Sequence, residues 1–309
     1  GQPHPHIPLP AQLYGAQRRN SSGLDLAHEP SLRQLAAQMK KHTQPLQLTP
    51  LLAGPFTGAE HVSLRNPADL SDVLGSVQHA SAEDVQAALQ AASAIAADWA
   101  ATSPDQRAAM LERAADVLQA DGPRAMALLV REAGKTWAHA VAELREAVDF
   151  LRYYAAQVRR EFDNHSHTPL GPVVCISPWN FPLAIFMGQV AAALAAGNPV
   201  LAKPAEATPA VAAMAVQALW QAGVPPAAVQ LLPGQGREVG MQLVRDAREH
   251  GIEVRAVDVL VSEVDCTLDV VEVLSREGDD DRCACWWAFR PAAAPMPSRA
   301  SLRPILAKA

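Results

Sequence analysis

The chain has 309 residues, of which 49% are hydrophobic and 19% charged, and its mean hydropathy is −0.01. This composition excludes an intrinsically disordered chain and is typical of a globular protein with one large domain or two modest ones. A net charge of −6 and a pI of about 5.9 give no electrostatic case for binding nucleic acid or an acidic membrane surface.

The sequence shows no signal for membrane insertion or secretion. Its longest apolar stretches are rich in alanine and fall short of the roughly 18–20 residues that span a bilayer. Residues 1–10, GQPHPHIPLP, lack a basic region followed by an apolar run, so they do not resemble a secretory signal. The first residue is Gly rather than Met, from which we expect the chain to be a fragment of a longer protein.

The cysteines are too few for a disulfide framework in a chain of this size, and we therefore expect a reducing, cytoplasmic setting. The four are Cys175, Cys266, Cys283 and Cys285. Cys283 and Cys285 are closer together than the cysteines of a usual CxxC zinc or redox motif. His4 and His6 could bind a metal, but their PHPH segment is more simply a mobile tail. We expect no metal site.

In chain order, residues 1–60 come first and are rich in Pro, Gln, Ser and His. We interpret them as a connecting arm with one short helix near the apolar segment LRQLAAQM. The next segment, VSLRNPADLSDVLGSV, contains two short runs typical of strands on either side of a turn at Asn66-Pro67.

Four helices are then predicted before the first strongly apolar strand. Ser81 and Asp84 form a capping-box pattern at the start of the first helix, and Ser103-Pro104 opens the second. The third follows Gly122-Pro123, and the fourth spans AHAVAELREAVDFLRYYAAQVRREF. Apolar residues recur at helical spacing in the first, second and fourth: Val85, Ala88, Leu89, Ala92 and Ile95; Met110, Leu111, Ala114, Val117 and Leu118; Val141, Leu144, Val148, Leu151 and Tyr154.

These four helices are expected to form one helical layer that covers a sheet. The charged residues of the fourth helix, Glu143 and Arg145 among them, are interpreted as a face exposed to solvent.

The sheet is predicted to begin at residue 169. GPVVCISPW, PVLAKPA and VQLLPGQG have the composition of strands, and FPLAIFMGQVAAALAAGN and TPAVAAMAVQALWQAG separate them as helices. Strands and helices that alternate every ~25–30 residues are the pattern of a doubly wound parallel α/β sheet. Ligands of such sheets bind at the carboxyl ends of the strands, which here are residues 176–181, 202–206 and 233–240.

Each strand end carries a group that could bind a ligand. Asn180 offers a side-chain N–H group that can stabilise a developing oxyanion, although for this residue taken alone an ordinary turn is the commoner explanation. Lys203 and Glu206 could bind a phosphate and a ribose hydroxyl, or they could simply be exposed residues. Gly234, Gly236 and Gly240 allow close approach of a ligand, but a plain turn explains them equally well.

The three strand-end segments taken together are more specific for a protein family than any one of them. GPVVCISPWNFPL, AAALAAGNPVLAKPAEATP and AGVPPAAVQLLPGQGREVG, in this order and spacing, closely resemble the NAD-dependent aldehyde dehydrogenase superfamily. The helical segment REAGKT…AELREAVDFLRYYA also resembles that superfamily. The arm segment IPLPAQLYGAQRRNSSGLDL resembles the stretch that leads into the L-glutamate γ-semialdehyde dehydrogenase domain of bifunctional bacterial proline-utilisation proteins. The resemblance covers residues 7–248.

The resemblance implies an incomplete Rossmann-like aldehyde dehydrogenase fold and a role for individual residues. It implies that the amide of Asn180 stabilises the oxyanion of a thiohemiacetal. It also implies a cofactor site formed by Ile176, Ser177, Pro178, Trp179, Lys203, Glu206, Gly236 and Gly240. Because Glu206 suits a free 2′-hydroxyl group, we expect the cofactor to be NAD rather than NADP.

Cys175 is predicted to be a core residue and not the nucleophile. It lies within an apolar strand, where burial disfavours the reactive thiolate. In the superfamily it resembles, the nucleophile occurs in a later segment.

The resemblance stops near residue 248. Residues 249–309 contain no Phe-Thr-Gly-Ser turn, and Cys266, Cys283 and Cys285 do not lie in surroundings typical of the superfamily. The composition of this tail suggests the hypothesis of a shift of reading frame near residue 248, with a genuinely divergent end as the alternative. We therefore divide the chain into an arm (1–60), a partial NAD-binding domain (61–248) and a divergent tail (249–309).

From the resemblance we expect the parent protein to oxidise L-glutamate γ-semialdehyde to L-glutamate with NAD, in proline catabolism. Its partner would be the proline dehydrogenase domain of the same parent chain, and a homo-oligomer is possible. The chain itself is expected to be inactive, because the nucleophilic cysteine and the general-base glutamate are missing. Two alternatives stay open: a dehydrogenase of another aldehyde, and a non-catalytic nucleotide-binding remnant.

Overall fold

The computed structural model of the chain describes residues 6–249 together with residues 284 and 285. The arm that begins this part contains two short 3-10 helices, one α-helix and one strand. These elements are η1 (Pro10–Gln12), α1 (Glu29–Met39), η2 (Lys40–His42) and β1 (Leu46–Leu48). The expected short helix is confirmed as α1, whereas strand β1 was not predicted, because three residues carry too little alternation to be recognised.

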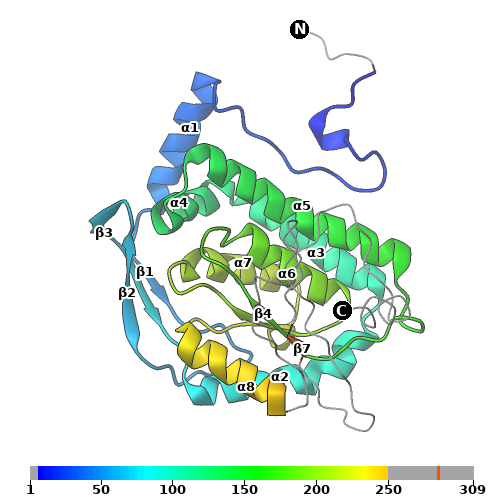
Figure 1. Cartoon of the computed structure of the whole chain (residues 1–309). Coiled ribbons are helices and arrows are strands. Elements are labelled where there is room, and N and C mark those ends of the chain that lie inside the picture. Colours follow the sequence, from blue (N-terminus) through cyan, green and yellow to red (C-terminus); the bar gives the residue numbers. More distant parts are fainter. Residues whose placement is uncertain (1–5, 250–283, 286–309) are drawn as a thin grey trace, which may run out of the picture.

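Next along the chain is the predicted pair of strands, which form an antiparallel hairpin. Strand β2 spans His61–Asn66 and β3 spans Asp69–Gln78, so the turn falls at Asn66-Pro67 as predicted. Strand β1 pairs in parallel with the other side of β3, and the three form a small sheet in the order β1-β3-β2. Figure 1 shows this sheet beside the main body of the molecule.

The four predicted helices are confirmed. They are α2 (Ala82–Ala101), α3 (Pro104–Ala120), α4 (Gly122–Ala133) and α5 (Trp137–Glu161). Ser81 and Asp84 form the predicted capping box, in which each side chain accepts a hydrogen bond from the other residue's backbone N–H. Pro104 occupies the first turn of α3, where its missing N–H has no partner to lose.

The predicted alternation of strands and helices is also confirmed, and it forms a parallel sheet in the order β6-β5-β4-β7. Its elements are β4 (Val173–Ile176), α6 (Ala184–Ala195), β5 (Val200–Lys203), α7 (Pro209–Gln221), η3 (Pro226–Ala228), β6 (Val229–Leu231), the π-helical turn η4 (Gly236–Gly240), α8 (Met241–Glu249) and β7 (Ala284–Cys285). Each neighbouring pair of strands is parallel. The α/β doubly wound fold class is therefore confirmed.

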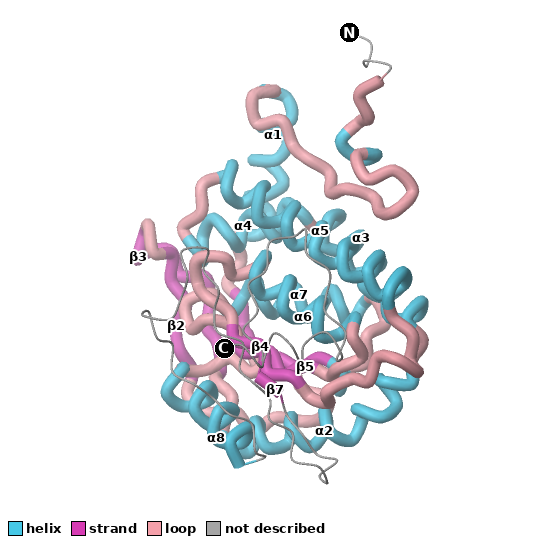
Figure 2. Tube along the Cα trace, turned by 45° about the vertical axis from the view of Figure 1, so that its right-hand side comes forward, coloured by secondary structure: helices cyan, strands magenta, loops and turns pink. Residues whose placement is uncertain are grey.

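The sheet has helices on both faces, as Figures 1 and 2 show. Val173 and Cys175 of β4 pack in the large core formed with α6 and α7, whereas Val174 between them packs with residues of α2 and α8. This alternation follows from the strand geometry, in which successive side chains point to opposite faces. Cys175 is 1% exposed, so its prediction as a core residue is confirmed.

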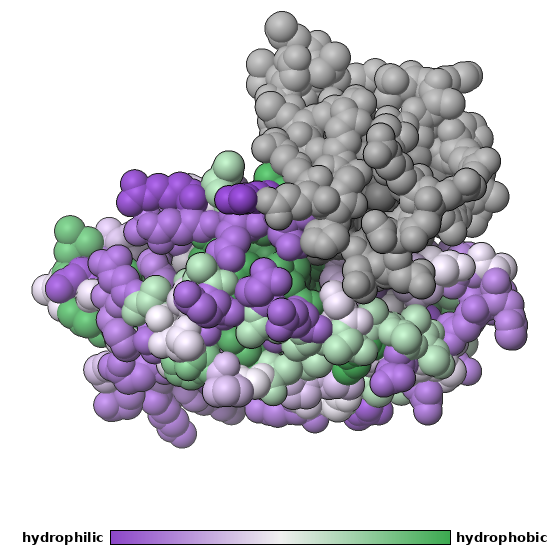
Figure 3. Space-filling view, turned by 90° about the horizontal axis from the view of Figure 1, so that it is seen from below, coloured by the Kyte–Doolittle hydropathy of each residue, from purple (hydrophilic) through white to green (hydrophobic). Residues whose placement is uncertain are grey.

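The expectation that α2–α5 form one layer is wrong. Helices α3, α4 and α5 pack on α6 and α7, but α2 packs beside α8 on the opposite face of the sheet. A doubly wound sheet is apolar on both faces, and α2 supplies the apolar stripe that covers the second one. The outer surface on this side carries many hydrophilic residues with apolar ones between them (Figure 3).

The prediction that Glu143 lies on a solvated face is also wrong. Glu143 is 1% exposed, and its carboxylate accepts a hydrogen bond from the backbone N–H of Leu183 at the start of α6. Sequence periodicity did not reveal this because the partner is 40 residues away. Arg145 is half-buried and donates from Nε to Ser21 Oγ of the arm.

Several predictions concern residues that the structure does not describe. His4, Cys266, Cys283 and the tail beyond residue 249 lie outside the described residues, except for the two residues of β7. Within residues 6–249, no helix combines the length and the apolar character that crossing a bilayer requires. The same part of the chain holds no cluster of three or more His, Cys, Asp or Glu side chains that could bind a metal ion.

Candidate functional site

The carboxyl ends of β4, β5 and β6 lie side by side at one edge of the sheet, because these neighbouring strands are parallel. Ile176, the last residue of β4, pairs with Lys203, the last residue of β5. The backbone N–H of Ser177 then donates to the carbonyl oxygen of Lys203 at 3.2 Å. On the other side of β5, the N–H of Leu232 donates to the carbonyl of Ala202 at 2.9 Å. The three loops with the predicted site residues therefore leave the sheet together.

The loop after β4 goes from buried to exposed within four residues. Ile176 is half-buried and Ser177 is buried, and the hydroxyl of Ser177 has no hydrogen-bond partner in the described part of the chain. Pro178 is half-buried, whereas Trp179 is 62% exposed. The sharp change in burial follows from the end of the strand, after which the backbone turns away from the core.

Asn180 is exposed at the tip of this loop. Its carbonyl oxygen accepts a hydrogen bond from Lys135 Nζ at 2.5 Å. Its side-chain amide makes no hydrogen bond to any other described residue. The main chain at this position is thus fixed, while the amide donor is available to a ligand.

Lys203 is not the simple exposed residue that the alternative interpretation proposed. The residue is 4% exposed, and Nζ donates to the carbonyl of Pro204 at 3.0 Å. Burial lowers the pKa of Lys203, because a buried ammonium loses hydration, and the charge of Glu206 partly offsets that effect. A cation that is buried in this way is a strong donor toward an anionic ligand.

Glu206 itself is exposed, and one of its carboxylate oxygens is already engaged. Oε1 accepts a hydrogen bond from the backbone N–H of Gly236 at 2.5 Å. This bond connects the loop after β5 to the bend after β6. The sequence assigned Glu206 to the sugar of a ligand but did not show that it also holds the glycine bend.

The three glycines of the bend have different roles. A Cβ atom at Gly234 would lie 2.4 Å from Val239 Cγ2, so a larger residue does not fit there. A Cβ at Gly236 would meet only Glu206 Oε1 at 3.6 Å, and one at Gly240 would lie 3.9 Å from Lys203 Cε. Gly240 therefore stands next to Lys203, while the tight packing of the bend depends on Gly234.

Two residues near the Asn180 loop were not identified from the sequence. Lys135 follows Gly134, the left-handed residue that ends α4, and its ammonium lies 2.7 Å from Glu143 Oε2. The glycine was a recognisable helix-stop signal. No local pattern indicated that the next side chain reaches a loop 45 residues away.

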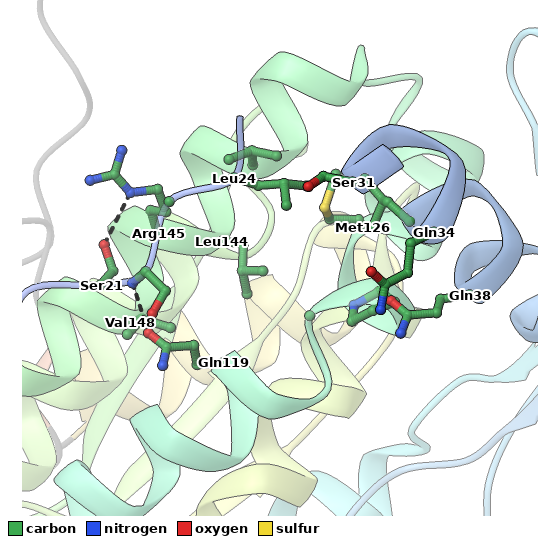
Figure 4. Close-up of a pocket in the computed structure, with 16 residues that line it drawn as sticks. Ser21, Leu24, Ser31, Gln34, Gln38, Gln119, Met126, Leu144, Arg145 and Val148 are labelled. Atoms are coloured by element: carbon green, nitrogen blue, oxygen red, sulfur yellow. Dashed lines mark hydrogen bonds between the residues drawn. The ribbon is translucent and has the colours of Figure 1, made fainter. Parts of the chain in front are cut away.

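A cavity of about 270 Å³ lies elsewhere, between the arm, α1 and helices α3 to α5 (Figure 4). Leu24, Gln34, Met126 and Leu144 are among the residues that line it. None of its lining residues belongs to the loops that follow β4, β5 and β6. We therefore place the candidate site at the strand ends, where the groups suited to chemistry gather.

The sequence pattern of the aldehyde dehydrogenase family matches residues 56–255. The chain belongs to this family. The family assignment that the strand-end motifs predicted is therefore confirmed, and the match includes every residue of the candidate site.

Curated relatives show which members of the aldehyde dehydrogenase family this chain is similar to. It is 56% identical over 253 residues to the bifunctional protein PutA of Klebsiella aerogenes, an alignment that covers 82% of this chain and 19% of that protein. It is 41% identical over 213 residues to the 1-pyrroline-5-carboxylate dehydrogenase of Bacillus cytotoxicus, covering 64% of this chain and 41% of that one. The chain thus spans about a fifth of the PutA relatives that it matches.

Solved structures agree with this likeness. The 1-pyrroline-5-carboxylate dehydrogenase from Thermus, solved with bound NAD, matches with a TM-score of 0.69 and 32% identity over 74% of this chain and 48% of that one. Proline utilization A from Bdellovibrio bacteriovorus matches with a TM-score of 0.68 and 31% identity over 73% of this chain and 25% of that one. This aldehyde dehydrogenase chain therefore has the same fold as the matched part of each of these two structures.

Proposed function

We propose that this chain forms a cofactor-binding part of a dehydrogenase that oxidises L-glutamate γ-semialdehyde to L-glutamate with NAD. The observation that carries the proposal is the meeting of three parallel strand ends. They bring the Asn180 loop, Lys203 and the Glu206–Gly236 contact to one edge of the sheet. Parallel α/β sheets bind nucleotides at such edges.

The residues at this edge fit a dinucleotide. Ser177 has a buried hydroxyl with no hydrogen-bond partner among the residues that the structure describes, and a polar group of a ligand would satisfy it. The ammonium of Lys203 would attract a phosphate group. The second carboxylate oxygen of Glu206 would accept a hydrogen bond from a ribose hydroxyl. Gly236, Gly240, Ile176, Pro178 and Trp179 would also contact the cofactor. When bound, NAD supplies the acceptor for the hydride that leaves the aldehyde carbon.

Asn180 would contribute to the reaction itself. Its amide N–H would donate to the oxygen of the aldehyde as negative charge develops there. Because the carbonyl of Asn180 is already bonded to Lys135, less reorganisation of the loop would be needed during the reaction.

The substrate and partner follow from the relatives. The identity of 56% to PutA and 41% to a 1-pyrroline-5-carboxylate dehydrogenase supports the semialdehyde as substrate. PutA is bifunctional, and we propose that the proline dehydrogenase part of the parent protein is the partner that supplies the substrate. The cysteine usage supports a cytoplasmic setting.

The test is a titration of the full chain with NAD, followed by protein fluorescence. Trp179 is exposed beside the candidate site and should report binding. We expect saturable quenching that is strongly reduced in Trp179→Phe and unchanged in Arg33→Ala, a control on the exposed surface of α1. Absence of saturation up to millimolar NAD would show that the chain does not bind this cofactor and would refute the proposal.

A further inference from the structure

Two charged side chains hold the loop between β4 and α6 in place. Lys135 Nζ lies 2.7 Å from Glu143 Oε2 and donates to the carbonyl oxygen of Asn180 at 2.5 Å. The same ammonium lies 4.4 Å from the centre of the Phe181 ring. Lys135 therefore contacts two consecutive residues of the loop as well as a buried carboxylate.

Glu143 acts on the far end of the same loop. Its Oε1 accepts from the backbone N–H of Leu183 at 2.9 Å and lies 3.4 Å from that of Ala184. These are among the N–H groups that the first turn of α6 leaves without partners in the helix, and a carboxylate there also complements the helix dipole. At the near end, Ser177 N–H is bonded to β5. The loop is therefore held by its main chain at its start, its tip and its end.

The side chain of Asn180 takes no part in this network. An oxyanion donor is effective when its position is fixed before the reaction and its N–H group is still available. If the side-chain amide of Asn180 held the loop in place, its N–H group would no longer be available to the substrate. If nothing held the loop, the amide would have no fixed position. Holding the loop through the carbonyl of the same residue meets both requirements.

We propose that Lys135 and Glu143 are positioning residues that fix the loop so that the Asn180 amide faces the reacting aldehyde oxygen. This inference rests on the proposed function for its chemical meaning. The geometry of the loop can nevertheless be measured without cofactor or substrate.

The experiment compares full-length variants labelled with 5-fluorotryptophan. The fluorine resonance of Trp179, identified by its loss in Trp179→Phe, reports the conformation of the loop. The side-chain amide resonance of Asn180, identified by its loss in Asn180→Ala, reports the position of the donor. Lys135→Met should shift or broaden both signals. Glu143→Ala should speed the exchange of the Leu183 amide proton at least tenfold, because that proton loses its acceptor.

The matched control is Arg131→Met. Arg131 lies on α4 near Lys135, its side chain is 15% exposed compared with 14% for Lys135, and it forms an ion pair with Asp72 of the hairpin at 2.6 Å. This variant removes a similar ion pair without touching the loop. It should leave the Trp179 and Asn180 signals unchanged, whatever its effect on thermal unfolding.

A second variant covers the case in which Lys135→Met does not fold, because that change leaves a buried carboxylate unpaired. Lys135→Met/Glu143→Gln removes both charges and keeps an acceptor for Leu183. It should fold and still shift the Trp179 signal. A folded double variant with wild-type Trp179 and Asn180 signals would overturn the inference, because the residues would then only stabilise the fold.

NAD titrations of the same samples separate the two proposals. If wild-type chain fails to bind NAD, the proposed function fails even though the loop responds to Lys135→Met. If NAD binds but the loop signals do not respond in any folded variant, the positioning role fails and the proposed function stands.

Discussion

The carboxylate of Glu206 accepts a hydrogen bond from the backbone N–H of Gly236 at 2.5 Å. This contact joins the loop after β5 to the bend after β6, across 30 residues of sequence. A change at either residue is therefore expected to affect the other, and the cofactor site that we propose behaves as one unit rather than as three separate loops.

Replacing Glu206 tests this coupling. Glu206→Ala removes both the acceptor for Gly236 and the proposed acceptor for a ribose hydroxyl. One hydrogen bond to a charged group contributes about 1.5 kcal/mol, so we expect NAD to bind about tenfold more weakly. Glu206→Gln keeps an acceptor oxygen and should lose less affinity, while narrowing the preference for NAD over NADP. Equal affinity of wild type and both variants in calorimetric titration would contradict the assignment.

The glycine bend offers a matched pair of substitutions. Gly234→Ala places a methyl group 2.4 Å from Val239 Cγ2 and should lower the free energy of unfolding by about 1–3 kcal/mol through overpacking. Gly236→Ala meets only Glu206 Oε1 at 3.6 Å and should change stability by less than about 1 kcal/mol. Urea unfolding measures both. Val239→Ala should restore part of the loss in Gly234→Ala, and a lack of any restoration would count against this packing explanation.

The buried side chain of Glu132 is expected to make the stability of the fold depend on pH. Its carboxylate is 4% exposed and accepts hydrogen bonds from the N–H groups of Ala210 and Val211 at the start of α7. Burial raises the pKa of Glu132 to about 8 from 4.5, more than these bonds lower it. Because the folded chain then holds a proton that the unfolded chain has released, the contribution of this group to stability is full below pH 4.5 and is lost as the pH rises to about 8.

The variant Glu132→Gln isolates that contribution. A neutral amide has no proton to lose, so the variant should gain on wild type in free energy of unfolding between pH 5 and pH 8, by about 1.4 kcal/mol for each unit of pKa shift. Denaturant unfolding at several pH values measures the difference. Parallel curves for the two proteins would show that Glu132 does not titrate in this range.

Truncation of the Arg107 side chain is expected to lower the stability of the fold strongly. The residue is 2% exposed, and its guanidinium donates to the carbonyls of Ala195 and Thr102 and to Asn164 Oδ1. Burial lowers the pKa of Arg107 to about 10, so it stays charged at neutral pH. We expect Arg107→Met to cost about 3 kcal/mol, because the buried carbonyl of Ala195 and the part-buried acceptors at Thr102 and Asn164 lose a charged donor.

Arg113 provides the comparison for that substitution. It is exposed, and its one hydrogen bond within residues 6–249 runs from Nε to the carbonyl of Ala222 at 2.9 Å. Arg113→Met should therefore cost about 1 kcal/mol. Thermal unfolding measures both variants, and a similar loss in the two would mean that the buried contacts of Arg107 are not responsible.

The last prediction concerns activity of the chain itself. Cys175 is 1% exposed in the core, and the three other cysteines do not lie in sequence surroundings typical of the family nucleophile. We expect no NADH formation from L-glutamate γ-semialdehyde above a control without protein, even where NAD binds. Formation that is abolished by Cys175→Ala would assign the chemistry to that residue and contradict its role as a core side chain.

The sequence by itself determined the family, the β2–β3 hairpin, helices α1 to α7 and strands β4 to β6. The capping box at Ser81, the proline that follows Ser103 and the apolar spacing defined the helices, because these signals depend on neighbours within one or two turns. The alternating strands and helices from residue 169 determined the parallel sheet, and the motifs at its strand ends identified the aldehyde dehydrogenase family. The identity of the cofactor and the roles of Asn180, Lys203 and Glu206 are still predictions.

Only the tertiary structure decided what those elements contact. Glu143 belongs to a helix rich in charges, and nothing within one turn of it indicates that it is buried against α6. The same holds for α2 on the opposite face, for Lys135 beneath the Asn180 loop and for the bond between Glu206 and Gly236. Periodicity records which side of an element is apolar, whereas the partner of a polar group is set by the packing of segments tens of residues apart.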